Sequence, residues 1–354
     1  MPSVFIQNKN PVSLRKRAVV TDRANARDVL AELLRRRKVD ESLRIKSMDG
    51  RVFIPVRDGS DISGNMSLSE EEFEKRFFHS SPQSRIKREL EARGLATDGA
   101  PEKWTRFGSS VLIRLPEMDE GARHEFASVY AAVLRSSSVY NITGRVRGQF
   151  REPEVELVYG PGGDVAHTEN GIRFNFDPAK IMFSPGNVNI RTSVREMDLD
   201  GKTVIDMFAG IGYFSLGIAR YSRPARVHAC EINPTSYGYL VRNIAANKLG
   251  DVIQPHLGDS RMVSPEIKAD AIIMGNFLSF SYLPHALRRI RPGGIILLHD
   301  TVSSDMLAVY KYALYRRIGM HGWKGAVLEQ KTVKSFAPHM WHIYVRVMVS
   351  DNRH

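Results

Sequence analysis

The sequence predicts an α/β protein whose C-terminal half forms a doubly wound sheet, and two observations carry this prediction. From Gly201 to about Arg346, short apolar runs with strand character alternate with segments of helical periodicity. The first run, in VIDMFAGIGYFSLGIAR (204–220), leads through a glycine turn into an apolar helix. Strands of such sheets meet their ligands at turns of this kind.

A chain of 354 residues exceeds one ordinary domain. We predict a small basic domain at 1–60, a mixed α/β domain at 71–195 and a catalytic domain at 196–354. The polar, Gly/Ser-rich stretch 58–70 (DGSDISGNMSLSE) is expected to be a linker. In the catalytic domain we expect strands at Thr203–Met207, Arg226–Glu231, Ile253–Leu257, Ala271–Met274, Gly294–His299 and His342–Val349.

The middle domain is expected to mix helices and strands. Phe73–Arg93 and Arg123–Leu134 have helical periodicity, and Val111–Leu115 is typical of a strand. His167–Phe176 alternates and predicts a strand pair or an edge strand. A basic patch of Arg145, Arg147 and Arg151 surrounds two glycines.

The first domain is expected to contain one helix and a hairpin. Asp22 can cap a helix that reaches Val39. Leu43–Lys46 and Arg51–Val56 predict two strands that meet through Asp49-Gly50, a hairpin signal. The polar face of the helix carries a basic run of Arg35, Arg36, Arg37 and Lys38. We assign this run, together with Arg145 and Arg147, to RNA contact.

The charge favours a polyanionic partner. The net charge is +12 and the pI is about 9.8, which favours nucleic acid ahead of an anionic membrane. Residues 1–60 hold 14 Lys or Arg against 7 Asp or Glu, more than half of the whole excess. The alternative is a basic surface that only keeps the protein in solution.

Other classes are disfavoured by composition. No uninterrupted apolar run approaches 18 residues, and the N-terminus lacks the apolar core of a secretory signal. The one cysteine, Cys230, cannot form an internal disulfide, so a cytoplasmic location is expected. The histidines do not cluster with it at metal-ligand spacing. We expect no metal, no membrane association and a monomer.

Strand ends in the catalytic domain predict a nucleoside site. Glycines at Gly210 and Gly212, after Asp206, allow backbone to approach a ligand. Glu231 ends the next strand, 25 residues later, where a carboxylate can accept both ribose hydroxyls. Gly258-Asp259 ends the third, where the Asp can receive an adenine amino group.

The ligand expected in this site is S-adenosylmethionine, as a co-substrate. The spacing is not G-x-G-x-x-G, so no pyrophosphate is cradled. Acidic Asp206 suits a cationic amino acid–sulfonium group better than the pyrophosphate of NAD. A tight turn that binds nothing is the alternative. The remaining residues assigned to this ligand are Phe208, Ile232 and Gly275.

Several motifs together resemble one tRNA-modifying family. DMFAGIGYF, HACEINP, Asn243 and Asn247, Gly258-Asp259, VKSFAPHMWH (333–342) and HTENGIRFNFDPAKIMFSPGN (167–187) look like the archaeal and eukaryotic tRNA guanine-N1 methyltransferases and wybutosine-synthesizing aminocarboxypropyltransferases. The resemblance covers essentially residues 20–350. It implies a Rossmann-like class I S-adenosylmethionine-dependent fold that acts on the purine 3′ of the anticodon.

Two places favour the aminocarboxypropyltransferase branch. The methyltransferases end the fourth strand in Met-Asn with a following proline, whereas this chain has Gly275 at the Asn position, Asn276 one residue later, and no proline. It also has SPGN (184–187) where the methyltransferase has Ser-Pro-Arg. The resemblance thus implies transfer of the 3-amino-3-carboxypropyl group to the wyosine-precursor base at position 37 of phenylalanine tRNA.

The general base is left open. The family usually has Glu-Arg where this chain has Ile190-Arg191, and isoleucine cannot accept a proton. Arg191 and Asn276 are the residues we assign to the reacting centre. Two rivals stay open: a methyltransferase acting on guanine N1 or on the imidazopurine carbon, and an RNA-binding protein without activity. The intact set of glycines and acids argues against the second.

Overall fold

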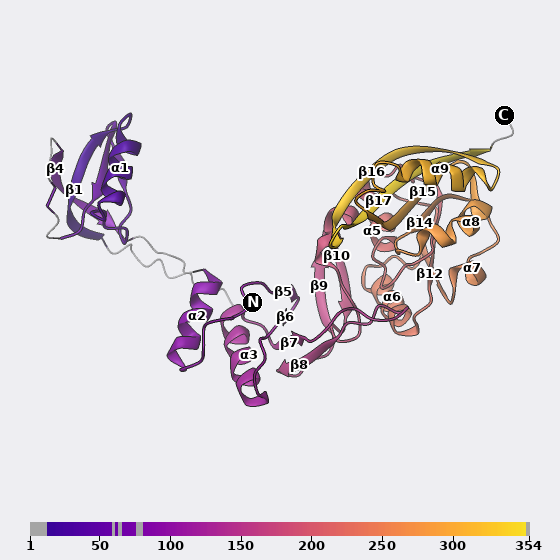
Figure 1. Ribbon diagram of the computed structural model, residues 1–354, viewed down its shortest axis with the longest axis horizontal. Helices are drawn as coiled ribbons and strands as arrows, with labels where there is room; N and C mark the ends of the chain where they lie inside the picture. Colours follow the sequence, from indigo (N-terminus) through magenta and orange to yellow (C-terminus); the bar gives the residue numbers. More distant parts are fainter. Residues whose placement is uncertain (1–12, 59–60, 63–65, 76–80, 352–354) are drawn as a thin grey trace. The chain divides into compact units, whose positions relative to one another are not determined.

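A computed structural model describes residues 13–58, 61–62, 66–75 and 81–351. The chain divides into two compact units between Ser84 and Arg85, and each is described by itself (Figure 1). No helix in the described ranges combines the length and apolarity needed to span a bilayer.

The N-terminal unit is an antiparallel sheet with one helix. The sheet order is β2-β3-β1-β4, from β1 (Ser13–Asp22), β2 (Lys46–Met48), β3 (Arg51–Pro55) and β4 (Ser67–Glu74). Helix α1 (Ala26–Arg35) buries Leu33 against Val19 and Ile54. The predicted hairpin is confirmed, because β2 pairs with β3 and both Asp49 and Gly50 have positive φ, as a type I′ turn requires.

Two expectations for this unit are wrong. The helix begins at Ala26 because Asp22 ends β1, and the Asp22 carboxylate accepts the Asn25 backbone N–H at 2.8 Å. The expected linker 58–70 ends early, because 67–74 form β4 on the edge of β1.

The charged residues of β4 explain why its sequence does not predict a strand. Its run Glu70–Glu72 lies opposite Arg15–Arg17 of β1, and opposite charges across a strand pair stabilise it. The strand therefore lacks the apolar alternation used for prediction. The sheet extends beyond the 1–60 range predicted for the first domain.

The second unit begins with a smaller mixed sheet. Its order is β5-β6-β7-β8, from β5 (Thr105–Phe107), β6 (Ser110–Ile113), β7 (Ser138–Ile142) and β8 (Val155–Tyr159). Helices α2 (Pro82–Ala92) and α3 (Glu120–Leu134) pack Ile86 and Phe126 into its core. The helix expected from Phe73 starts only at Pro82, because Phe73 belongs to β4. The expected strand pair is confirmed as β9 (Val165–Glu169) and β10 (Ile172–Phe176).

A seven-stranded sheet forms the rest of this unit (Figure 1). Its order is β13-β12-β11-β14-β15-β17-β16; the first five strands are parallel, and β17 is antiparallel to both of its neighbours, β15 and β16. The strands are β11 (Thr203–Asp206), β12 (Arg226–Glu231), β13 (Ile253–Leu257), β14 (Ala269–Met274), β15 (Ile290–Ser303), β16 (Trp323–Ala337) and β17 (Met340–Asp351). All six predicted strands are present, and β16 is an additional edge strand.

Helices cover both faces of this sheet, as the doubly wound prediction requires. Successive residues of β11 point to opposite faces, so Val204 packs in one core cluster and Ile205 in the other. The first cluster receives α5 (Ser215–Tyr221) and α6 (Pro234–Ala246), and the second receives α8 (Ser279–Arg289) and α9 (Tyr310–Gly319). The short elements are η1 (Pro185–Asn187), α4 (Val188–Ser193), η2 (Val194–Glu196) and α7 (Ser260–Val263).

Candidate active site

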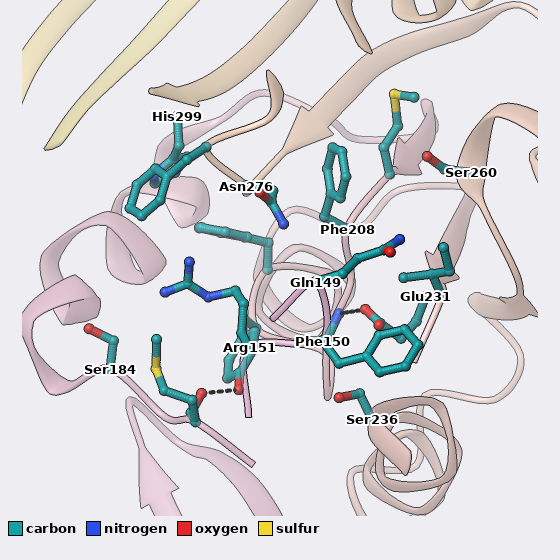
Figure 2. Close-up of a pocket in the computed structure, with 18 of the residues that line it drawn as sticks. Gln149, Phe150, Arg151, Ser184, Phe208, Glu231, Ser236, Ser260, Asn276 and His299 are labelled. Carbon is teal, nitrogen blue, oxygen red and sulfur yellow. Dashed lines mark hydrogen bonds between the residues drawn. The ribbon is translucent and has the colours of Figure 1, made fainter. Parts of the chain in front are cut away.

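A cavity lies at the carboxyl ends of β11, β12 and β14, where open α/β sheets bind ligands (Figure 2). Figure 2 shows Glu231 and Ser260 on one side and Arg151, Asn276 and His299 on the other. We name the first side the carboxylate wall: Glu231, Ile232, Gly258, Asp259 and Ser260. We name the second side the histidine wall: Arg151, Gly275, Asn276, Phe277, His299 and His342.

Asp206 stabilises the glycine turn from the side that faces away from the cavity. This carboxyl is fully buried and accepts the Ser215 hydroxyl at 2.7 Å and the Phe208 N–H at 3.2 Å. Burial raises its pKa to about 6, although both hydrogen bonds lower it. Asp206 is not among the residues that line the cavity. Its contacts hold the turn, and the ligand contact expected for it is not seen in this geometry.

The two glycines of the turn have different surroundings. Gly210 lines the cavity with φ of 58°, and a Cβ there would lie 2.4 Å from the Tyr213 ring. Gly212, with φ of 100°, faces Leu216 of α5 and does not line the cavity. Only the first therefore brings bare backbone to a ligand, whereas the second allows close helix packing.

Glu231 joins β12 to the glycine turn. Its Oε2 accepts the Gly210 N–H at 2.7 Å and its Oε1 accepts the Asn233 N–H at 2.8 Å. Burial raises the pKa of this carboxyl, while these backbone hydrogen bonds lower it. Each carboxylate oxygen retains a lone pair, so a diol such as a ribose could still be bound.

The rest of the carboxylate wall combines a glycine, an oriented carboxylate and a hydroxyl. Gly258 has φ of 137°, and a Cβ there would meet Val263 at 2.6 Å. The Asp259 carboxylate is held by Arg261, which lowers its pKa. The buried Ser260 hydroxyl has no partner within the described residues. Further lining comes from Ile232 and from Phe208, whose ring lies 4.8 Å from that of Tyr282.

Gly275 and Asn276 lie side by side at the end of β14. A Cβ on Gly275 would meet the Phe214 ring at 2.7 Å, so the glycine keeps this wall open. The Asn276 side-chain oxygen accepts the Leu278 N–H at 3.1 Å. Its amide points into the cavity in Figure 2. The structure thus brings both predicted residues to the site.

Arg191 lines the cavity, but its guanidinium is committed to a buried ion pair. Its Nε and one terminal nitrogen each donate to a Glu169 oxygen at 2.6 Å, and it also donates to the Ser184 carbonyl at 2.9 Å. The neighbouring Ile190 is buried in the hydrophobic core. The geometry gives Arg191 a positioning role, because its contacts hold the 184–191 segment.

The structure adds two features to the predicted site. The loop between β7 and β8 brings Gln149, Phe150 and Arg151 to the cavity. The Arg151 guanidinium lies 5.2 Å from the Phe277 ring centre, and no described carboxylate pairs with it. The basic patch containing Arg151 was visible in the sequence, although its place in the site was not.

The second added feature is a pair of buried histidines, His299 and His342. His299 lies within β15 and His342 lies near the start of β17, and His299 Nδ1 is 2.7 Å from His342 Nε2. The strand predicted from the sequence ends at His299, which places this residue near the predicted cleft, although β15 itself continues to Ser303. His342 closes the VKSFAPHMWH motif, and only the strand pairing reveals that it meets His299.

The residues assigned to RNA are exposed or partly exposed. Arg35, Arg36 and Arg37 are exposed at the end of α1 and beyond it, and Lys38 is half-buried. Arg36 pairs with Glu32 at 2.5 Å. In the second unit, Arg145 and Arg147 are exposed on the loop that carries Arg151, and Arg147 pairs with Glu154 at 2.9 Å.

This fold and site define a Rossmann-like S-adenosylmethionine-dependent transferase domain. Residues 165–318 match the model of the TRM5/TYW2 methyltransferase domain, and residues 86–163 match that of the TYW2 N-terminal domain. The chain belongs to the TRM5/TYW2 family.

Curated relatives carry two activities. A tRNA(Phe) (4-demethylwyosine(37)-C(7)) aminocarboxypropyltransferase of Pyrococcus horikoshii is 36% identical over 251 residues, covering 70% of this chain and 90% of the relative. The tRNA (guanine(37)-N(1))-methyltransferase Trm5b of Pyrococcus abyssi is 33% identical over 255 residues, covering 71% and 76%.

Solved structures of both kinds of relative are similar to this chain. P. horikoshii TYW2 in complex with MeSAdo has a TM-score of 0.68 at 32% identity, covering 76% of this chain and 99% of that one. Trm5b from P. abyssi has a TM-score of 0.69 at 29% identity, covering 95% and 99%.

Proposed function

We propose that this chain transfers the 3-amino-3-carboxypropyl group of S-adenosylmethionine to the wyosine-precursor base at position 37 of phenylalanine tRNA. The relative with this named activity is covered over 90% of its length. The observation that carries the choice between the two activities is the composition of the histidine wall, which contains no carboxylate among the described lining residues.

The absence of a carboxylate from the described lining residues of this wall matters because the two reactions remove the proton of the acceptor atom at different stages. Guanine N1 carries a hydrogen and has no free lone pair, so methylation there requires a base before or during attack. A ring carbon attacks with its π electrons and loses its hydrogen afterwards. Ile190 stands where the family places the base, and the lining carboxylates Glu231 and Asp259 belong to the opposite wall. Carbon attack is therefore the reaction that this wall favours.

The carboxylate wall suits the adenosine part of the co-substrate. Glu231 would accept the ribose hydroxyls, with the adenine ring between Ile232 and Phe208 and its polar edge towards Asp259 and the unpartnered Ser260 hydroxyl. Bound S-adenosylmethionine supplies a sulfonium leaving group and the γ-carbon that is transferred. The residues of the chain then have to orient the acceptor base and exclude water.

The exposed basic residues are proposed to hold the tRNA. Arg35, Arg36, Arg37 and Lys38 would contact phosphates, and Arg145 and Arg147 would lie nearer the modified base. Charge reversal at Arg35–Arg37 should weaken tRNA binding and flatten its salt dependence. Unchanged binding would remove them from the interface. We also place the reaction in the cytoplasm.

The runner-up is a methyltransferase acting on guanine N1 or on the imidazopurine carbon, which the Trm5b relative favours. S-adenosylmethionine labelled separately in the methyl carbon and in the carboxypropyl carbons separates the two. We expect the carboxypropyl label in tRNA and the methyl label in released methylthioadenosine. Methyl label in tRNA would replace the proposal with the runner-up.

A further inference from the structure

Two buried histidines in the histidine wall are left without an assigned task. His299 is 2% exposed and His342 is 1% exposed, and both line the cavity. His299 Nδ1 lies 2.7 Å from His342 Nε2, so one proton is shared between the rings. The outer nitrogens, His299 Nε2 and His342 Nδ1, have no partner in the described parts of the chain.

This arrangement always leaves one lone pair open. When His299 Nδ1 donates the shared proton, His342 carries its only N–H hydrogen on Nδ1 and His299 Nε2 is bare. When His342 Nε2 donates, the roles are exchanged. Unpartnered buried nitrogens are costly, and apolar side chains would fill the same space without that cost. Packing alone therefore does not account for the pair, which points to a functional role.

The surroundings keep both rings neutral. Burial lowers the pKa of His299 to about 3, with His342 adding to the shift. Burial lowers the pKa of His342 to about 4, and Lys334 and Arg151 add to it. The other close neighbours are the Phe214, Tyr344 and Phe277 rings. The lone pair is consequently present throughout the neutral range.

The pair adjoins the place expected for the acceptor base. His342 lies 4.9 Å from Phe277, ring centre to ring centre, and His299 lies 5.4 Å from Phe214, the ring against which Gly275 is packed. Figure 2 shows His299 across the cavity from Glu231. A base held between Asn276 and Arg151 would thus be beside the histidines and away from the adenosine end.

We propose that the His299–His342 pair accepts the proton that the acceptor carbon loses during transfer. This rests on the proposed function. The ring carbon forms a C–C bond to the γ-carbon while the γ-carbon–sulfur bond breaks and sulfur keeps the electron pair. The ring is left cationic, with hydrogen and the new substituent on one carbon. The open histidine nitrogen takes that proton, and the C–H electrons restore the aromatic ring.

A weakly basic pair is sufficient for this step. The cationic ring is strongly acidic because loss of the proton restores aromaticity, so a strong base is unnecessary. Guanine N1–H is only weakly acidic, and the same pair would be a poor base for it. The shared proton can shift between the rings, which spreads the transient charge over both. The histidine pair is therefore suited to transfer to a ring carbon and not to guanine N1.

The first test uses His299→Asn and His342→Gln with acceptor tRNA carrying deuterium on the acceptor carbon. In the unsubstituted enzyme, proton loss follows attack rapidly, and the deuterium isotope effect on single-turnover formation of the rearomatised base, followed by its ultraviolet absorbance, should be near unity. Each variant should form the rearomatised base about 10²-fold more slowly and should show a clear primary isotope effect on that step. A merely structural histidine would slow transfer without changing the isotope effect, and that result would overturn the proposal.

His228→Asn is the matched control. His228 also contacts a histidine, with its Nδ1 3.1 Å from His256 Nε2, but neither residue lines the cavity. Its transfer rate and isotope effect should not change. Failure of the proposed function is a separate result, because the unsubstituted enzyme would then move no carboxypropyl label at all.

Nitrogen-15 NMR of the unsubstituted enzyme, with labelled histidines, tests the pair even where a variant does not fold. At neutral pH we expect one proton between the two rings, one protonated outer nitrogen and one bare outer nitrogen. Methylthioadenosine binding, followed by calorimetry, reports whether each variant keeps its site. Two protonated outer nitrogens, with no proton between the rings, would leave neither outer nitrogen with a lone pair and would overturn the proposal.

Discussion

The two walls of the cavity treat their polar groups in opposite ways. On the carboxylate wall, Glu231 accepts two backbone N–H groups and Asp259 is held by a guanidinium. On the histidine wall, Arg151 has no carboxylate partner in the described chain, and two histidine nitrogens are unpartnered. The carboxylates of the first wall are already oriented by hydrogen bonds before any ligand binds, whereas the cation and the histidines of the second wall lack such partners in the described chain.

This difference teaches where the selectivity of the reaction resides. A preorganised nucleoside site can serve methyl and carboxypropyl transfer equally, because both use the same co-substrate. Under the proposed function, the histidine wall would decide which acceptor atom can react, through the groups that it offers and those that it lacks. Glycine at 275 and isoleucine at 190 remove the amide and the carboxylate that the methyltransferases have in the resemblance.

The largest expected effect concerns the buried ion pair between Arg191 and Glu169. Glu169→Gln would leave the buried Arg191 guanidinium uncompensated, and the free energy of unfolding should fall by about 3–5 kcal/mol. Denaturant unfolding measures it, and adding Arg191→Met to the same chain should recover part of the loss. A loss below about 1 kcal/mol with abolished transfer would instead make Arg191 a participant in the reaction.

The next effect concerns the support behind the glycine turn. The folded-state pKa of Asp206 is about 6 against an ordinary 3.8, because of burial. Between these values the folded chain holds a proton that the unfolded chain has released, so stability falls as pH rises from about 4 to about 6. The change should total about 3 kcal/mol.

Asp206→Asn isolates this contribution. Denaturant unfolding at intervals between pH 4 and pH 7 should give a profile without the decline that Asp206 causes. Parallel profiles for the two proteins would show that Asp206 titrates normally, and the turn would then need another explanation for its buried acid.

The carboxylate wall was predictable because its signals are local. A strand, a glycine turn and an acid at the next strand end stand within 25 residues, and their spacing reflects the chemistry of one ligand. The same holds for the Asp49-Gly50 hairpin. Gly212 and Asp206 belong to the same motif, but in the structure neither lines the cavity and both support the turn. Sequence spacing cannot distinguish a residue that faces a ligand from one that lies behind it.

The histidine wall could not be assembled in the same way. His299 and His342 are 43 residues apart and meet only through the antiparallel register of β15 and β17. Arg151 arrives from a separate sheet, on a loop whose course no periodicity encodes. Strand β4 shows the same limit, because its acidic run makes sense only opposite the basic run of β1.

Glu231→Ala tests the preorganised wall. It removes a charged acceptor of two ribose hydroxyls and releases the Gly210 N–H, so affinity for S-adenosylmethionine should fall by about 10²-fold. Glu231→Gln should lose less, because one oxygen remains. Calorimetry with methylthioadenosine should give the same ratio, since the ribose is common to both. Glu266→Gln, at an exposed acid, is the control and should bind normally.

The smallest effect is expected at Arg151 and probes the boundary between the walls. Arg151→Gln should raise the KM for tRNA by about tenfold, or about 1.4 kcal/mol, because one unpaired cation that could meet the acceptor nucleotide is lost. Arg151→Lys should recover only part, because an ammonium lacks the planar face that lies over Phe277. Methylthioadenosine affinity should stay constant in both. If it falls as far as tRNA affinity does, Arg151 belongs with the nucleoside site, and the two walls do not divide the work between co-substrate and acceptor.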